Sequence, residues 1–112
     1  MTEESVSEEK KVYVRYPFRN QRVSDVEPNT NVAVTGVIVS KDTEIISFII
    51  EDDTGRLNVI TDNTNSFNVL KEGQLVRVFG KTWGEGQEIE LKSDIIQDFS
   101  EIDFELYKKL VL

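Results

Sequence analysis

Apolar and polar residues alternate over several segments in the middle of the chain, as they do in strands that bury one face. The clearest pair of segments is residues 45–50, which are rich in β-branched side chains, and residues 56–60, which alternate strictly (Arg56, Leu57, Asn58, Val59). Between them lies a turn motif, Asp52-Asp53-Thr54-Gly55. Its carboxylates accept hydrogen bonds from their own backbone, and its glycine supplies a positive φ. The pattern predicts a β-hairpin.

Three further strands are predicted around this hairpin. Residues 31–40 are rich in valine, and Gly36 lies where a barrel strand bends or bulges. Residues 74–83 bury Leu75 or Val76, together with Val78, and present the alternate positions on the opposite face (Arg77, Phe79, Lys81, Trp83). A Gly84-Glu85-Gly86 turn then leads into a strand over residues 88–96.

A short helix is predicted over residues 62–71, between the third and fourth of these strands. Asp62 or Thr64 caps its beginning, and Gly73 ends it. Phe67 and Leu70 are three residues apart and so share one face of the helix. We expect that face to plug one end of a barrel.

The order of these elements predicts an all-β fold, a five-stranded Greek-key barrel of the oligonucleotide-binding (OB) type with the short helix between strands 3 and 4. The chain divides into a disordered acidic tail (residues 1–11), the barrel with an N-terminal edge segment (residues 12–98) and a C-terminal helix (residues 99–112). Residues 12–22 are basic and aromatic, without an acid, and residues 23–28 are expected to form a turn that closes the bottom of the barrel.

The net charge of −8 is unfavourable for a simple nucleic-acid binder, so its distribution matters. Residues 12–83 hold eight basic residues against nine acids, whereas residues 84–112 hold three lysines against eight acids. A nearly neutral barrel still allows a local basic strip, but without the strong field that drives tight nonspecific binding.

The composition argues against enzymatic chemistry. The chain has no cysteine and no histidine, and no phosphate loop or nucleophile motif is present. Asp52 and Asp53 are interpreted as turn formers, because they lack the spacing of a calcium loop. We therefore expect no enzyme activity, no cofactor and no metal site.

No apolar run approaches the roughly 20 residues that span a bilayer, and no signal-peptide pattern follows Met1. We therefore expect no membrane association. The expected location is the cytoplasm, with the nucleoid, in a prokaryote, or the nucleus in a eukaryote.

Three stretches resemble the OB-fold barrels of replication protein A, in particular its small and middle subunits and their archaeal and telomeric relatives. Residues 22–39 resemble the beginning of the first strand, residues 48–59 the hairpin, and residues 76–81 the fourth strand with its glycine. The resemblance covers roughly residues 22–96. These motifs are specific for the fold and weak for the function, because the barrel hosts many ligands.

The resemblance implies that single-stranded DNA lies across strands two and three, between the loop joining strands one and two and the loop joining strands four and five. RNA is the alternative ligand. DNA-binding members often carry a base-stacking aromatic residue at the end of strand three, where this chain has Asp62. That difference favours weaker binding on this face.

Eight residues are candidates for nucleic-acid contact because they are basic, polar or aromatic and lie on exposed faces or in the basic segment: Tyr16, Arg19, Arg56, Asn58, Arg77, Phe79, Lys81 and Trp83. Trp83 alternatively covers the barrel edge or a protein partner. Phe79 alternatively packs against the N-terminal segment or the terminal helix. The charged candidates are alternatively ordinary solvated residues.

The C-terminal helix carries the strongest sign of a protein partner. Its apolar residues form two adjacent stripes that are too broad for one small barrel to cover: Ile102, Phe104, Leu106, Tyr107, Leu110 and Val111. The resemblance implies that this helix is an assembly element, in a complex or a homo-oligomer. The alternative is that it folds back onto its own barrel.

Two functions therefore remain open. The first is a single-stranded nucleic-acid-binding module, an accessory subunit of a replication-protein-A-like complex that acts largely through protein contacts. The second is an OB-fold assembly module with little or no nucleic-acid binding. The residues that favour the first function are basic or aromatic: Arg15, Arg19, Arg22, Arg77, Lys81 and Trp83. Those that favour the second are acidic: Asp62, Glu85, Glu88 and Glu90.

Overall fold

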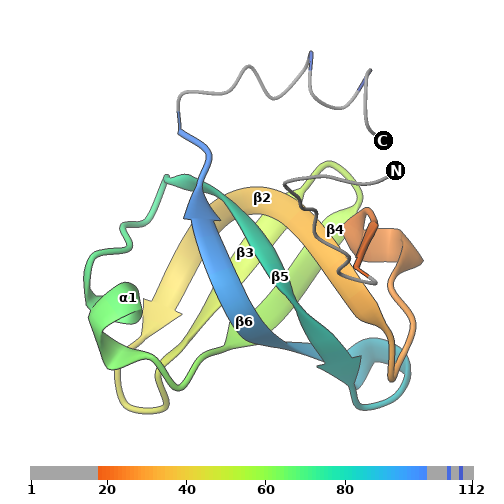
Figure 1. Cartoon of the computed structure of the whole chain (residues 1–112), viewed down its shortest axis with the longest axis horizontal. Helices are drawn as coiled ribbons and strands as arrows, with labels where there is room; N and C mark the ends of the chain where they lie inside the picture. The colour runs from red at the N-terminus through yellow and green to blue at the C-terminus, as the bar shows by residue number, and fades with distance from the viewer. Residues whose placement is uncertain (1–17, 101–105, 107–108, 110–112) are drawn as a thin grey trace, which may run out of the picture.

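A closed ring of hydrogen-bonded strands forms the body of the protein (Figure 1). The computed structural model describes residues 18–100 together with Leu106 and Lys109. The barrel strands are β2 (Asn31–Asp42), β3 (Ser47–Asp52), β4 (Gly55–Ile60), β5 (Leu75–Trp83) and β6 (Glu90–Asp98). They pair in the order β2-β3-β4-β6-β5, and β5 pairs with β2 to close the ring. The predicted all-β barrel is confirmed.

A sixth strand adds to this ring at one edge. The two-residue strand β1 (Arg19–Asn20) pairs in parallel with β2, opposite Val32 and Ala33. The sequence predicted an edge strand within residues 12–22, and β1 is the part of it that the structure describes. The predicted tail and the rest of the edge segment lie outside the described residues.

The barrel interior is filled by alternate residues of every long strand. In β4, Leu57 and Val59 are buried while Arg56 and Asn58 point outward, as the alternation predicted. In β5, Val76 and Val78 are buried, which confirms the predicted orientation of that strand. The other core residues come from all sides of the barrel: Val23, Val32, Val34, Ile38, Phe48, Ile50, Phe67, Leu70 and Leu91.

The hairpin between β3 and β4 forms where it was predicted, and its turn has the predicted carboxylate hydrogen bonds but lacks the predicted positive φ. Asp52 Oδ1 accepts hydrogen bonds from the backbone N–H groups of Thr54 (2.7 Å) and Gly55 (3.1 Å). The expected positive φ at Gly55 is wrong, because the glycines with positive φ in the described chain are Gly73, Gly84 and Gly86. The aspartate side chain, rather than a left-handed glycine, closes the turn.

The predicted bend in β2 is displaced. The pairing of β2 with β3 shifts register between Ile38 and Ser40, rather than at Gly36. Gly36 instead allows the two strands to approach closely, because a Cβ atom there would lie 2.9 Å from the carbonyl oxygen of Glu51. A glycine in a strand marks either feature, and the sequence alone does not distinguish them.

Helix α1 (Thr64–Asn68) is shorter than the predicted helix over residues 62–71, and its cap is neither of the predicted residues. Asn63 caps it by accepting a hydrogen bond from the Ser66 N–H at 3.0 Å. Phe67 and Leu70 are both buried in the core, so the predicted plug is confirmed.

A lysine from β2 contacts the end of this helix and the turn that follows it. Lys41 Nζ donates to the carbonyl oxygens of Phe67 (3.0 Å) and Leu70 (2.8 Å) and lies 4.3 Å from the centroid of the Phe67 ring. These contacts fix the chain after α1 in a tight turn well before Gly73, where the sequence had placed the end. In Figure 1, α1 lies at one end of the barrel.

Short 3₁₀ turns connect the remaining elements. The turn η1 (Val23–Asp25) precedes β2 and places Val23 in the core, as expected for a segment that closes the barrel. The turn η2 (Gly86–Glu88) joins β5 to β6. Among the described residues, no helix is long and apolar enough to span a bilayer.

Most of the predicted C-terminal helix lies outside the described residues. Of its six proposed interface residues, Leu106 alone is described; it is helical and 52% exposed. Ile102, Phe104, Tyr107, Leu110 and Val111 lie outside, and the predicted interface stays a prediction.

Candidate nucleic-acid interface

Two hollows lie along the outer face of the β3–β4 hairpin and share Asn58. The first, which we call the loop hollow, has a volume of about 520 Å³ and is formed mainly by β2, β3 and the loop between them. The second, the acidic cleft, has a volume of about 760 Å³ and lies against the loop between β5 and β6. Together they mark a path from one loop to the other across β3 and β4.

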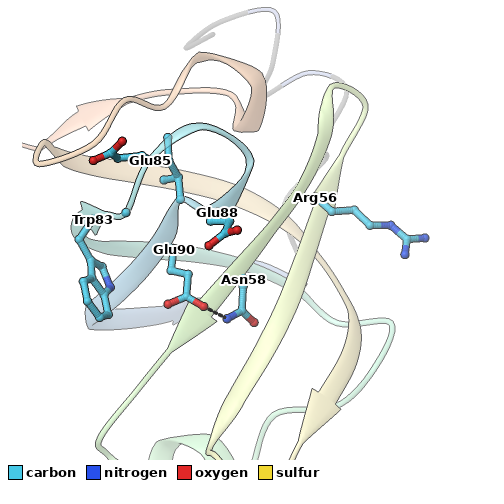
Figure 2. Close-up of a pocket in the computed structure, with 8 residues that line it drawn as sticks. Arg56, Asn58, Trp83, Glu85, Glu88 and Glu90 are labelled. Atoms are coloured by element: carbon cyan, nitrogen blue, oxygen red, sulfur yellow. Dashed lines mark hydrogen bonds between the residues drawn. The ribbon is translucent and has the colours of Figure 1, made fainter.

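The acidic cleft is named for three glutamates that line it, Glu85, Glu88 and Glu90 (Figure 2). Three of the predicted contact residues line it as well: Arg56, Asn58 and Trp83. The fold thus brings Arg56 and Trp83, which are 27 positions apart in the sequence, to the same cleft. Three glutamate carboxylates surround them there.

The two polar candidates in the cleft are engaged with acids. Asn58 Nδ2 donates to Glu90 Oε2 at 2.9 Å, which fixes the amide against β6. Arg56 Nε donates to Glu51 Oε2 at 3.2 Å, and its side chain extends away from the three glutamates (Figure 2). Neither group is positioned as an isolated cation or donor for a phosphate.

Trp83, at the end of β5, is the exposed aromatic residue of this surface. Its side chain is 52% exposed although tryptophan is the largest apolar side chain. Gly84 follows it directly, so the chain turns away from β5 next to the ring. An exposed flat ring beside a strand end is the kind of platform on which a base stacks.

Trp83 also lines a third hollow, which shares no other residue with the acidic cleft. This lysine hollow has a volume of about 320 Å³ and is lined by Asn29, Lys81, Thr82, Trp83 and Lys92. Lys81 was a predicted contact residue, whereas Lys92 was not. Trp83 therefore stands at the boundary between an anionic and a cationic surface.

Arg77 and Phe79 form a packed cluster under β1, away from these hollows. The Phe79 and Phe18 rings meet edge to face with centroids 5.6 Å apart. Arg77 donates from Nη2 to Asn20 Oδ1 at 2.7 Å, and its guanidinium lies 4.8 Å from the Phe79 ring centroid. For Phe79, this is the packing alternative that the sequence left open.

The two remaining candidates come from the N-terminal segment. Arg19 is an exposed residue of β1 and lines a hollow with Asp25 and Glu27, and Trp83 is not part of that lining. Tyr16 lies outside the described residues. The fold therefore places Arg56 and Asn58 with Trp83 at the acidic cleft and Lys81 with Trp83 at the lysine hollow, whereas Arg19, Arg77 and Phe79 line neither of these two hollows.

Lys92 was missed because its neighbours depend on strand register. It lies opposite Lys81 in the β5–β6 pair, in the stretch of unbroken register next to the turn. Alternation along one strand gives the face of a side chain, whereas its cross-strand neighbour depends on which residues pair. Within the described part of the chain, no group of three or more acidic residues is arranged to hold a metal ion.

Comparison with solved structures identifies the architecture. Ten1, a telomere capping protein of S. pombe, superposes with a TM-score of 0.64 at 11% identity, over 84% of this chain and 93% of its own. A chain of the S. pombe Stn1–Ten1 complex superposes with a TM-score of 0.64 at 12% identity, over 84% of this chain and 88% of its own. A replication protein A domain of Methanococcus maripaludis superposes with a TM-score of 0.60 at 20% identity, over 72% of this chain and 96% of its own.

The barrel is an OB fold. The fold-level resemblance to replication protein A barrels, predicted from residues 22–96, is therefore confirmed. No protein-family model matches the chain, and no curated protein sequence matches it significantly. At these identities the likeness establishes the OB fold and leaves its ligand to be argued from the surface of this chain.

Proposed function

We propose that this OB-fold chain binds single-stranded nucleic acid with modest affinity, as an accessory subunit that acts largely through protein contacts. The observation that carries the proposal is the position of Trp83. It is half exposed and lies where the path across β3 and β4 reaches the β5–β6 loop. Stacking on such a ring is tolerant of sequence and suits a single strand.

The charges of the same surface support a modest affinity. Glu85, Glu88 and Glu90 line the cleft beside Trp83, and Arg56 is paired with Glu51. Few cations are left to neutralise phosphates, and phosphate contacts supply much of the affinity for nucleic acid. A domain with so few phosphate contacts depends on a protein partner to stay bound to single-stranded nucleic acid.

The partner contact is assigned to the C-terminal residues. The two apolar stripes of residues 102–111 and the exposure of Leu106 support this part of the proposal. Ten1, one of the structural neighbours, has been solved in complex with Stn1. The proposal assigns no reaction to the chain, and it places the chain with the nucleic acid, in the nucleoid or the nucleus.

A second candidate function is favoured by the acidic cleft itself. If the three glutamates keep nucleic acid off the barrel, the chain is an assembly module and Trp83 contacts a protein. Tryptophan is frequent among residues that dominate protein interfaces. The two functions differ in what binds to Trp83.

Trp83 is the single tryptophan of the chain, so its fluorescence reports directly on the decisive residue. We expect saturable quenching on titration with oligo-dT or oligo-U at low salt. The slope of log K against log salt should be shallow, about −1 to −3, at about −0.7 for each neutralised phosphate. No quenching at low salt, with a stable oligomer in a solution mass measurement, would favour the assembly module.

A further inference from the structure

The lysine hollow beside Trp83 has a feature that the proposed function does not require. Lys81 and Lys92 are cross-strand partners of β5 and β6, and the next outward pair along these strands is Trp83 and Glu90. Side chains two residues apart on a strand share a face and lie roughly 7 Å apart along it. The lysine pair and Trp83 therefore lie on one surface.

The two lysines carry like charges and form no ion pair among the described residues. Both side chains are exposed, and neither has a hydrogen-bond or ion-pair partner among the described residues. Like charges directly opposite each other in an antiparallel pair are destabilising. The arrangement therefore opposes folding slightly and provides a local site of positive charge in a chain whose net charge is −8.

The backbone under the lysine pair is firmly held. A Cβ atom on Gly80 would lie 2.1 Å from the carbonyl oxygen of Lys92, so glycine is required for β5 and β6 to approach this closely. Thr82, between Lys81 and Trp83, is fully buried and its hydroxyl donates to the carbonyl oxygen of Glu27. These contacts fix the backbone positions of Lys81 and Lys92 relative to that of Trp83.

The charges around Trp83 favour one route for an anionic chain that contacts it. Glu85, Glu88 and Glu90 line the acidic cleft and repel phosphates, and Glu90 also lies directly opposite Trp83 on the outer face of β5 and β6. Lys81 and Lys92 form the next pair along that face and attract phosphates. A strand that leaves Trp83 along this face therefore meets two cations, whereas a strand that enters the cleft meets acids.

We propose that Lys81 and Lys92 bind the backbone phosphates next to a base stacked on Trp83, so that the strand crosses the outer face of β5 and β6 instead of entering the acidic cleft. This inference rests on the proposed function and specifies the route of the strand. An acidic peptide would also satisfy two lysines, but the stacking ring beside them matches the alternation of base and phosphate in a single strand.

The test measures binding of a fluorescently labelled oligo-dT to the full chain by anisotropy at several salt concentrations. The variants are Lys81→Gln and Lys92→Gln, and the matched control is Lys71→Gln, an exposed lysine in the loop after α1. Each test variant should make the log K against log salt slope about 0.7 shallower. The affinity ratio across a tenfold range of salt then falls about fivefold for each lysine, while Lys71→Gln stays at wild type.

Several results would overturn the inference. If both lysine variants keep the wild-type slope while Trp83→Ala weakens binding, the strand contacts Trp83 without passing the lysines, so this inference is wrong and the proposed function survives. If the wild-type chain binds no oligonucleotide at low salt, both proposals fall. If a poly-glutamate peptide competes as well as unlabelled oligo-dT, the lysines recognise charge alone and the nucleotide assignment is wrong. Thermal melts of the variants establish that each one is folded.

Discussion

The carboxylate of Asp52 accepts a hydrogen bond from the backbone N–H of Val23, 2.9 Å away and 29 positions earlier in the chain. Its other oxygen accepts from the N–H groups of Thr54 and Gly55 and from the Thr54 hydroxyl. One side chain thus closes the β3–β4 hairpin and attaches to it the segment that leads into the barrel.

Replacing Asp52 should therefore destabilise the fold. Asp52→Ala leaves several backbone donors without their acceptor, and we expect a loss of about 2 kcal/mol in the free energy of unfolding. The control is Asp53→Ala, because Asp53 forms a solvent-exposed ion pair with Arg22 at 3.4 Å. That pair should contribute less than about 1 kcal/mol. Urea unfolding measures both, and equal losses would contradict the assignment.

Lys41 should stabilise the barrel through α1. Lys41→Met keeps the length of the side chain but removes the ammonium group that contacts the carbonyl oxygens of Phe67 and Leu70. We expect a loss of about 1–2 kcal/mol, because hydrogen bonds from charged groups are stronger than neutral ones. Lys71→Met, at an exposed position, should change the unfolding free energy by less than about 0.5 kcal/mol. A neutral effect of Lys41→Met would show that water replaces the amine.

Trp83 should matter for binding and little for stability. Trp83→Ala removes the proposed stacking platform and should weaken oligonucleotide binding by about 1–3 kcal/mol, measured by anisotropy of a labelled oligo-dT. The melting temperature should hardly change, because the side chain is 52% exposed. Val69→Ala, at an apolar residue that is 71% exposed beside α1, should leave binding unchanged. An unaltered affinity for Trp83→Ala would remove this residue from the site.

The C-terminal residues should control assembly. Deletion of residues 103–112, or Leu106→Asp, should leave the barrel folded and abolish oligomer or complex formation, since a charge in an apolar interface is costly. Lys109→Glu, a charge change at an exposed residue outside the two apolar stripes, should have a small effect. Light scattering gives the mass and circular dichroism the fold. Unfolding of the truncated chain, with a monomeric full-length protein, would assign these residues to the core of the barrel.

The stability of the fold should change with pH only under acidic conditions. With no histidine, the chain has no side chain whose ordinary pKa lies between pH 5 and 8, so stability should be nearly constant there. The Ser100 hydroxyl, the Ser100 N–H and the Gln74 side chain lower the pKa of Asp98 below 3.8. A carboxylate whose pKa is lowered in the folded protein stabilises the fold at pH values above its ordinary pKa.

That stabilisation is lost as the pH falls through the pKa of Asp98 in the folded protein. Thermal melts from pH 8 to pH 2 should therefore fall only below about pH 4, and Asp98→Asn should remove part of that dependence. A change of melting temperature centred between pH 5 and 8 would show that another group titrates.

The sequence alone determined the architecture of the barrel, because the signals involved are local. Alternation decides which side chains of β4 and β5 face the core, and the spacing of Phe67 and Leu70 decides what plugs its end. The site was only partly predictable, because local signals do not show which distant residues lie around a given side chain. Trp83 was recognisable as an exposed aromatic residue at a strand end, but the residues around it were not.

Contacts between distant segments decided the rest, and only the tertiary structure supplies them. The pairing of β5 with β6 sets Lys92 opposite Lys81, Glu90 accepts a hydrogen bond from Asn58, and Phe18 covers Phe79. Alternation has a period of two residues and fixes only the face of each side chain. Which charge or ring lies across from it depends on strand pairing, and a shift of one residue in that pairing changes every neighbour.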